Sequence, residues 1–287
     1  CSFPRIVSVQ FASELFILRI PPMQHCKKIC FVTLMLLSLI AFAYALFIEP
    51  NRIGVRHLAV EDDALNRVLK GKTAVHITDL HINTIGKRER TILKIIDDLK
   101  PDLIFLTGDY VQWKGRYDGA LNFLSRLSAT LGVWTVMGDY DYSSSRESCR
   151  FCHEPGCGRL TQQHQVKFLR NRADRISFSN GTVWLGGFDP ESALEEITGV
   201  PELLPQDKAP AIMLGHNPLL FDSVDANHDV LILAGDTHGG QIPLPAWLWR
   251  IMGYEKNARY SHGFFQEGLK KMYVSRGLGT SHLPVRF

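Results

Sequence analysis

The chain has 287 residues, of which 45% are hydrophobic, 10% aromatic and 21% charged; this composition is typical of a folded globular protein and excludes disorder as its main theme. Its formal net charge is +3, and because residues 1–48 hold four basic residues and one acidic residue, the rest of the chain is neutral. A neutral domain without a run of Lys or Arg lacks the charge that attracts nucleic acid, so we exclude nucleic acid as the main partner.

Twenty consecutive uncharged residues, 29–48, follow Lys27 and Lys28. They predict a transmembrane helix, because about 20 apolar residues span the hydrocarbon core of a bilayer. A cleaved signal peptide is the alternative, since Ala41-Phe42-Ala43 has the small-x-small pattern that a signal peptidase recognises.

Met23 stands just before this Lys-Lys-apolar pattern, whereas the chain starts at Cys1. We therefore expect residues 1–22 to be upstream sequence that is not native to the protein, within an N-terminal segment at 1–28. The residues after the apolar segment, 49–287, are expected to form the globular part of the chain.

Short apolar runs alternate with amphipathic stretches from residue 73 onward. The first series predicts strands at 73–78, 102–107 and 133–137 and helices at 87–99 and 116–129. The second series predicts strands at 175–179, 183–188, 211–214, 230–233 and 272–275, with short helices around 163–170 and 191–198. Strands that are apolar throughout are typical of parallel sheets covered by helices, so we expect a layered α/β fold.

Nearly every predicted strand is followed by an Asp or a His. Because the carboxyl ends of parallel strands line the ligand crevice of an α/β sheet, five such groups should converge on one place. Each motif alone is common in loops, so only their succession after apolar runs indicates a site. The groups are Asp79 with His81, Asp109 after Gly108, Asp139 to Asp141 after Gly138, His216 after Gly215, and Asp236 with His238 after Gly235.

In this order the motifs resemble those of the calcineurin-like metallophosphoesterases, D-x-H, G-D, G-N-H, G-H and G-H-x-H, over residues 73–287. The strings GDTHGGQ at 235–241 and VSRGLGTS at 274–281 are similar to the membrane-associated branch of that family, which includes a UDP-2,3-diacylglucosamine diphosphatase of lipid A synthesis. The resemblance implies a four-layer α/β/β/α sandwich. It also implies a further strand after Phe287, so we expect the C-terminus to be truncated.

Carried over by position, the resemblance implies two divalent metal ions bridged by Asp109. Such a pair stabilises the charge that develops in phosphoryl transfer and supplies hydroxide near neutral pH. The first ion would be held by Asp79, His81, Asp109 and His238, and the second by Asp109, Asp139, His216 and Asp236.

Two departures from the family pattern fall on the second ion. Asp139 stands in place of the Asn of G-N-H, and Asp236 in place of the first His of G-H-x-H. The resulting set of three carboxylates and one imidazole favours Mn²⁺, with Mg²⁺ as the alternative, over Zn²⁺.

Tyr140 is the third departure and stands in place of the family's His, the residue expected to assist the leaving oxygen. We predict that Tyr140 and Asp109 are the catalytic residues. Tyrosine, whose pKa is ordinarily about 10, is a poor proton donor at neutral pH but still donates a hydrogen bond to a phosphoryl oxygen. This favours a substrate with a good leaving group, a diphosphate over a simple diester.

Two further groups lie after the GDYDY motif. Forked hydrogen bonds to a diphosphate could come from Arg146, Arg150 and Arg159. The alternative is that these three are solvated surface side chains. A spacing similar to that of zinc ligands is found at Cys149, Cys152, His153 and Cys157. Because the four residues are closer together than in most structural zinc sites, free thiols are favoured over a bound zinc.

The apolar and aromatic stretch 242–254 follows the last metal motif and contains Trp247, Trp249 and Tyr254. Its composition suits a segment that rests on a membrane or covers acyl chains. Packing into the core of the domain is the alternative.

We interpret the chain as a membrane-tethered, two-metal hydrolase that cleaves the diphosphate of a lipid-linked nucleotide sugar. The first candidate substrate is UDP-2,3-diacylglucosamine, cleaved to UMP and 2,3-diacylglucosamine 1-phosphate. Membrane lipid is the other expected partner, and no feature indicates a protein partner. The helix would cross the inner (cytoplasmic) membrane once, with the catalytic domain on the cytoplasmic side. A broad phosphodiesterase of the same family and an inactive membrane-anchored binding protein are the alternatives.

Overall fold

The computed structural model describes residues 23–112, 117–142, 164–189, 200–207, 209–239, 241–281 and 284–286. By its internal contacts the chain divides into two units, Cys1–Ala43 and Tyr44–Phe287. Several predictions lie outside the described residues: the origin of residues 1–22, the helix around 191–198, and the arginines and cysteines of the segment 143–163.

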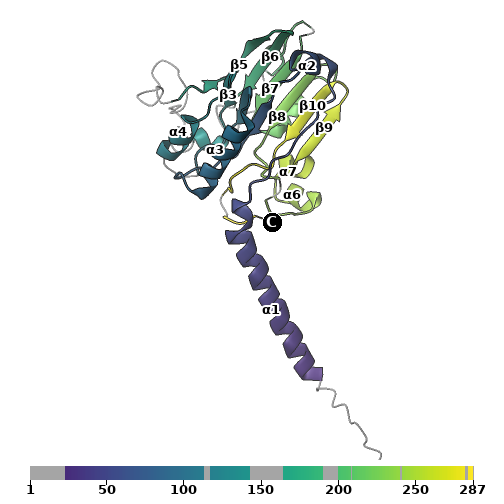
Figure 1. Ribbon diagram of the computed structural model, residues 1–287. Helices are drawn as coiled ribbons and strands as arrows, with labels where there is room; N and C mark the ends of the chain where they lie inside the picture. The colour runs from purple at the N-terminus through teal and green to yellow at the C-terminus, as the bar shows by residue number, and fades with distance from the viewer. Residues whose placement is uncertain are drawn as a thin grey trace, which may run out of the picture. The chain divides into compact units, whose positions relative to one another are not determined.

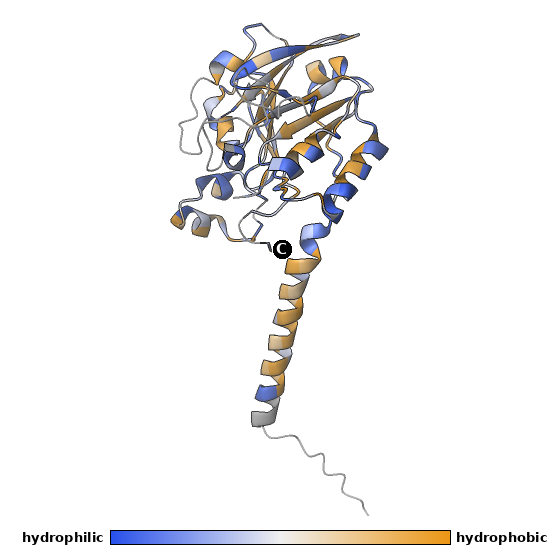
Figure 2. Ribbon diagram, turned by 90° about the vertical axis from the view of Figure 1, so that its left-hand side faces the viewer, coloured by the Kyte–Doolittle hydropathy of each residue, from blue (hydrophilic) through white to orange (hydrophobic). Residues whose placement is uncertain are grey.

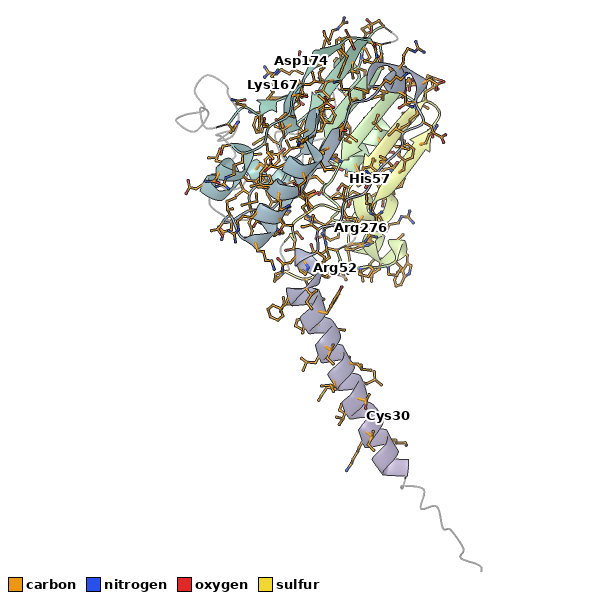
Figure 3. All side chains as sticks on the ribbon, viewed as in Figure 1. Cys30, Arg52, His57, Lys167, Asp174 and Arg276 are labelled. Carbon is orange, nitrogen blue, oxygen red and sulfur yellow. The ribbon has the colours of Figure 1, made fainter. Side chains whose placement is uncertain are left out.

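Helix α1, Met23–Phe47, includes the apolar segment except for its last residue, Ile48, and is long and apolar enough to cross a membrane. Its side chains from residue 27 to residue 43 are exposed, and the helix ribbon has hydrophobic colours along most of its length, with a hydrophilic part near its N-terminal end (Figure 2). One of them is Cys30, a free thiol (Figure 3). A helix that exposes apolar side chains all round is stable in an apolar environment and not in water, which is the property of both a membrane anchor and a signal sequence.

The first sheet has four parallel strands in the order β1-β2-β3-β4. The crossovers contain helix α3, Lys87–Leu99, and helix α4, Tyr117–Leu124, which lie on one side of the domain (Figure 1). The four strands are Ala74–Ile77, Leu103–Thr107, Gly132–Val136 and Lys167–Phe168.

The helix predicted around 163–170 is wrong, because residues 167–168 form the edge strand β4. Lys167 and Phe168 pair with Trp134 and Thr135 of β3. The buried Phe168 ring packs among the apolar side chains of the helix-covered core, and that contact outweighs a weak helical pattern of eight residues.

The second sheet has six strands in the order β5-β6-β7-β8-β10-β9. Its four central strands are parallel, and the edge strands β5 and β9 run antiparallel to their neighbours. The sequence pattern missed β9 because an edge strand is half-exposed and lacks a continuous apolar run. In chain order the strands are Arg172–Phe178, Gly181–Phe188, Ala211–Gly215, Val230–Ala234, Gly263–Glu267 and Lys270–Val274.

Four short helices were also not predicted; one of them, α5 (Asp139–Tyr142), lies within the GDYDY motif. Helix α2, Asp63–Val68, begins at Asp62, whose carboxylate accepts a hydrogen bond from the Leu65 N–H at 2.9 Å. Helices α6, Ala246–Ile251, and α7, Glu255–Arg259, follow β8 and contact each other. Each has six residues or fewer, too short for a clear 3.6-residue period.

Alternate side chains of each central strand serve different cores. On β2, Leu103 and Phe105 pack between the two sheets, whereas Ile104 and Leu106 pack against α3 and α4. The outer face of the second sheet packs against two 3-10 helices, η4 (Pro201–Leu203) and η5 (Pro218–Ser223). The layers are therefore helix, sheet, sheet and helix, which confirms the four-layer sandwich; in the described residues the fourth layer is made of these short 3-10 helices.

Candidate metal centre

Loops at the carboxyl ends of β1, β2, β3, β7 and β8 carry the seven side chains that the sequence singled out as metal ligands. The structure gathers them into two clusters, and within each cluster one ligand atom per residue lies within 4.8 Å of the others. The first cluster is Asp79, His81, Asp109 and His238, and the second is Asp139, His216 and Asp236.

The backbone of this region is strained. Seven non-glycine residues have positive φ in the described chain, and five of them belong to the clusters, with φ from 45° to 71°. The left-handed region is unfavourable for residues with a Cβ atom, and such strain persists only where the surroundings impose it. Here hydrogen bonds between loops impose it: the Asp79 N–H donates to Gly108 O at 3.0 Å and the His81 N–H to Asp109 O at 2.9 Å.

Asp141, to which the sequence assigned no role, joins the loops after β2 and β3. Its fully buried carboxylate accepts hydrogen bonds from the N–H groups of Asp109 and Gly138, both at 2.8 Å, and of Tyr110 at 2.7 Å. Gly138 packs so closely on the Asp109 side chain that a Cβ atom there would collide with it. Asp141 therefore fixes the orientation of Asp109, and the only sequence signal for this was a second Asp within GDYDY.

In the first cluster the imidazoles of His81 and His238 stack, with Nε2 atoms 3.0 Å apart. Burial is the main cause that lowers the pKa of each ring to about 4, so both are neutral at pH 7. Asp79 Oδ1 lies 3.6 Å from His238 Nε2, and Asp109 Oδ2 lies 3.4 Å from His81 Nε2. Two neutral imidazoles and two carboxylates, all buried, form a donor set that fits a divalent cation.

Asp109 lies between the clusters. Its Oδ2 faces His81, and its Oδ1 lies 3.4 Å from His216 Nε2. Burial opposes ionisation of this carboxyl group, but the charge of the His216 imidazole outweighs it and holds the pKa of Asp109 well below its usual range. Asp109 is thus an anion with one oxygen toward each cluster, which is the geometry of a bridging ligand.

In the second cluster His216 Nδ1 lies 2.6 Å from Thr107 O, which turns Nε2 toward the carboxylates. Nε2 is buried and makes no hydrogen bond to the described residues; it lies 3.9 Å from Asp236 Oδ1. Burial, followed by the charge of Asp236, raises the pKa of Asp139 to about 6. An orphaned imidazole nitrogen facing three carboxylates also fits a cation.

Lys256 of α7 enters the second cluster, and the sequence analysis missed it. Its Nζ lies 2.6 Å and 2.5 Å from the two oxygens of Asp236 and 4.0 Å from Asp139 Oδ2. No sequence signal links Lys256 to the metal motifs, because 20 residues separate it from Asp236. The cluster therefore contains a protein cation next to two of its carboxylates.

Tyr140 lies at the edge of both clusters. Its ring packs edge-to-face on His81 with centroids 4.6 Å apart, and its N–H donates to Asp109 Oδ1 at 2.9 Å. Burial, and then the charges of Asp109 and Asp139, raise the pKa of the phenol above its usual value of 10. Its hydroxyl group stays protonated at neutral pH and acts as a hydrogen-bond donor.

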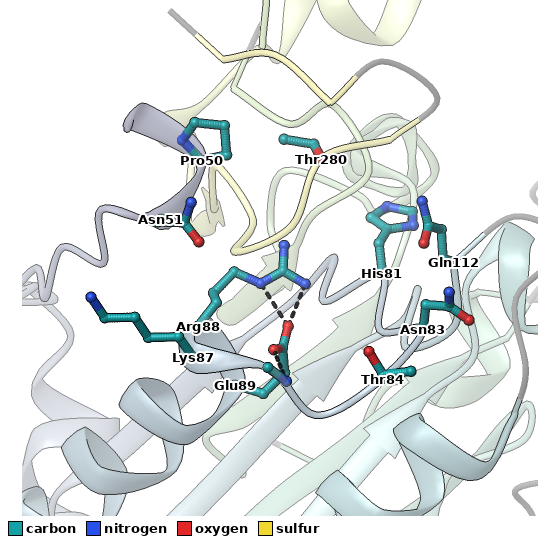
Figure 4. Close-up of a pocket in the computed structure, with 11 residues that line it drawn as sticks. Pro50, Asn51, His81, Asn83, Thr84, Lys87, Arg88, Glu89, Gln112 and Thr280 are labelled. Carbon is teal, nitrogen blue, oxygen red and sulfur yellow. Dashed lines mark hydrogen bonds and ion pairs between the residues drawn. The ribbon is translucent and has the colours of Figure 1, made fainter. Parts of the chain in front are cut away.

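A polar cavity of about 280 Å³ adjoins the first cluster through His81 (Figure 4). The guanidinium group of Arg88 extends into the space shown in Figure 4 and pairs with Glu89, Nη2 to Oε1, at 2.7 Å. The cavity offers both cationic and amide side chains next to the candidate metal centre. Its lining includes Asn51, Asn83, Lys87, Arg88, Gln112 and Thr280.

Helix α6 presents an apolar surface to solvent and has no buried residue. Trp247 is 60% exposed and Ile251 is 74% exposed, and Tyr254 beyond the helix is 49% exposed. Trp249 is partly buried, and the centroid of its ring lies 5.8 Å from that of the Tyr254 ring. The alternative interpretation, that this stretch packs into the core, is therefore wrong for Trp247 and Ile251.

Comparison with known proteins places this geometry in a family. The family model of the calcineurin-like phosphoesterases matches residues 72–240, more than half of the chain. The chain therefore belongs to the calcineurin-like phosphoesterase family and has a metallophosphoesterase domain; it is a hydrolase of a metal-dependent family.

Three relatives show what the chain is similar to. YkuE, an uncharacterized metallophosphoesterase of Bacillus subtilis, is 27% identical over 263 residues, which cover 86% of this chain and 85% of the relative. LpxG of Chlamydia trachomatis, a UDP-2,3-diacylglucosamine pyrophosphatase, is 26% identical over 310 residues, which cover 86% of this chain and 90% of the relative. YaeI of Escherichia coli, a phosphodiesterase, is 29% identical over 198 residues and 63% and 64% of the two chains.

Proposed function

We propose that the chain is a membrane-anchored hydrolase that cleaves the diphosphate of a lipid-linked nucleotide sugar. UDP-2,3-diacylglucosamine is the first candidate substrate, with UMP and 2,3-diacylglucosamine 1-phosphate as products. The observation that carries the proposal is the placement of Asp109, whose two oxygens face two clusters of metal-type ligands. Two divalent cations, Mn²⁺ in preference to Mg²⁺, suit the oxygen-rich donor set of these clusters.

A pair of divalent cations supplies Lewis-acid polarisation of phosphoryl oxygens and hydroxide near neutral pH. The residues of the chain would hold the cations, neutralise their charge and orient the phosphoryl group. Asp109 fixes the two clusters relative to each other. His81 and His238 offer neutral nitrogens as metal ligands, and Tyr140 donates a hydrogen bond to the phosphoryl group or the leaving oxygen. A nucleoside monophosphate leaves from a diphosphate with little protonation, so a phenol that keeps its proton is sufficient.

The lipid part of the proposal is supported by α6 and by LpxG. Helix α6 packs on α7, and α7 carries Lys256 into the second cluster, so an exposed apolar surface adjoins the candidate metal centre. LpxG, a UDP-2,3-diacylglucosamine pyrophosphatase, matches 86% of this chain at 26% identity. Helix α1 would anchor the enzyme at the inner membrane with the domain on the cytoplasmic side, where such lipids are accessible.

Product analysis tests the substrate. We expect mass spectrometry to detect UMP and 2,3-diacylglucosamine 1-phosphate from UDP-2,3-diacylglucosamine, with turnover well above that of bis-p-nitrophenyl phosphate under the same conditions. The match to the phosphodiesterase YaeI supports the second candidate function, a broad phosphodiesterase. Faster turnover of the diester than of the lipid diphosphate would favour that function and contradict ours.

The role of Tyr140 can be separated from metal binding by leaving-group dependence. We expect Tyr140→His to raise kcat on diphenyl phosphate, a substrate with a poor leaving group, by about tenfold or more, because an imidazole donates a proton where a phenol does not. On bis-p-nitrophenyl phosphate the same variant should change little. Tyr140→Phe is the control that keeps the ring and removes the hydroxyl. Equal effects of Tyr140→His on both diesters would exclude the proposed role.

The acyl contact can be tested on α6. The double variant Trp247→Ala with Ile251→Ala should raise KM for the diacyl substrate by about 10- to 100-fold, because each exposed side chain contributes up to about 1.5–3 kcal/mol when it is buried against an acyl chain. A short-chain analogue should be unaffected. Leu269→Ala, at the turn between β9 and β10, removes an apolar side chain that is 51% exposed and serves as the control. A loss shared by both substrates would refute the contact.

A further inference from the structure

Lys256 occupies a position that the metal-ligand motifs do not explain. Its ammonium group contacts both oxygens of Asp236, the residue that replaces a His of the family pattern. The side chain is 23% exposed, while the Asp236 side chain is 8% exposed, so the ion pair is largely shielded from water. Charged pairs of this kind interact far more strongly than exposed ones.

The second cluster brings several carboxyl groups close to one buried imidazole. Asp109, Asp139 and Asp236 bring three carboxyl groups together, and His216 Nε2 is buried without a hydrogen-bond partner in the described chain. The Asp236 N–H also donates to both oxygens of Asp79, at 3.1 Å and 3.2 Å, which places the Asp236 backbone against the first cluster. Among the described Lys and Arg side chains, Lys256 is the one that pairs with Asp236, at 2.5 Å, and its Nζ lies 4.0 Å from Asp139 Oδ2.

The first cluster has a different environment. Its four ligands are Asp79, His81, Asp109 and His238, and each side chain is at most 7% exposed. None of the ion pairs found in the described residues joins a Lys or Arg to these four side chains. A divalent ion that enters the first cluster therefore meets two carboxylates and two imidazoles, and none of the described Lys side chains pairs with them.

We propose that Lys256 is a built-in counter-cation of the second metal position, so that the two positions differ in affinity. The first cluster binds a divalent ion tightly. A second ion binds only when it displaces the Lys256 ammonium group from Asp236, and its affinity is correspondingly weaker. Lys256 is in these terms a positioning residue: it holds Asp236 in place and sets the affinity of the second ion.

Titration of the metal-stripped full chain with Mn²⁺ tests this inference, with calorimetry for affinity and electron paramagnetic resonance for the coupling between ions. The wild type should bind one equivalent tightly, with the spectrum of an isolated Mn²⁺, and a second equivalent at least tenfold more weakly. Lys256→Met should tighten the second equivalent by tenfold or more and produce spin-coupled pairs at lower Mn²⁺ concentration. The first equivalent should keep its affinity, which a merely structural defect would not allow.

Two variants serve as controls. Lys256→Arg keeps the charge and should keep the weak second equivalent. Arg259→Met removes a cation from the same helix, one that pairs with Asp222 at 2.7 Å, and should leave both affinities unchanged. Two equal equivalents in the wild type, or a second affinity that Lys256→Met does not change, would overturn the inference.

If Lys256→Met does not fold, two equal equivalents in the wild-type titration would still overturn the inference. The inference rests on the proposed metal-dependent function, but its test contains no substrate. Failure to hydrolyse a lipid diphosphate would therefore leave it standing. A protein that binds no Mn²⁺ would overturn both, and one that binds two ions equally would overturn this inference only.

Discussion

Asp109→Asn should lower kcat on any phosphoester substrate by about 10³-fold or more, a typical loss when a central member of a catalytic unit is removed. The variant keeps the size of the side chain and its hydrogen bond from the Tyr140 N–H, but it removes the charge that both clusters share. Because each cluster loses one anionic donor, the metal content of the purified variant should also fall. Turnover and metal content are both measurable on the same preparation.

Asp97→Asn is the matched control for this charge change, since Asp97 is an exposed carboxylate on α3. It should leave activity and metal content unchanged. Circular dichroism should show that Asp109→Asn is folded. If Asp109→Asn kept more than a tenth of wild-type turnover, a bridging role for Asp109 would be excluded.

Asp141→Ala should be the most destabilising single change in the region. It removes the acceptor of four buried N–H groups, three of them at 2.7–2.8 Å, from Asp109, Tyr110 and Gly138, and a longer one at 3.3 Å, from Val111. Each unsatisfied buried donor costs about 1–3 kcal/mol, so the free energy of unfolding should fall by at least about 3 kcal/mol. For a domain of this size that corresponds to a decrease in Tm of about 10 °C.

Thermal unfolding of chelator-treated protein checks this prediction, because bound metal would otherwise mask the difference. Asp174→Ala is the control, since Asp174 lies on the exposed edge strand β5 and its loss should change Tm by no more than about 2 °C. A variant at position 141 with wild-type Tm would show that other groups hold the Asp109 loop.

The strands that place the candidate site were predictable because they are buried on both faces. Strands β2, β7 and β8 are buried at every position, and an Asp or a His follows each of them within two residues. In a parallel sheet this order of residues dictates that the side chains gather at one edge. Elements that depend on partners were not predictable: β4 and β9 are edge strands whose sequences carry a weak signal, and they form because a neighbouring strand offers hydrogen bonds.

The two functional side chains that the sequence did not reveal differ in the signal available. Asp141 lies two residues from Asp139, so a second carboxylate in the same turn could have been recognised as a support for the loop. Lys256 comes from a five-residue helix after a stretch of apolar and aromatic residues, and only the fold brings its ammonium group to Asp236. The sequence therefore revealed the carboxylates of the second cluster but not the ammonium group that pairs with them.

Metal dependence of turnover tests the central claim most directly. The protein should be stripped with a chelator, shown by elemental analysis to be metal-free, and assayed for hydrolysis before and after addition of Mn²⁺, Mg²⁺ or Zn²⁺. We expect no turnover without metal, full recovery with Mn²⁺, partial recovery with Mg²⁺, and no recovery of Asp109→Asn with any ion. Undiminished hydrolysis by metal-free protein, or activity that returns only with Zn²⁺, would contradict the account.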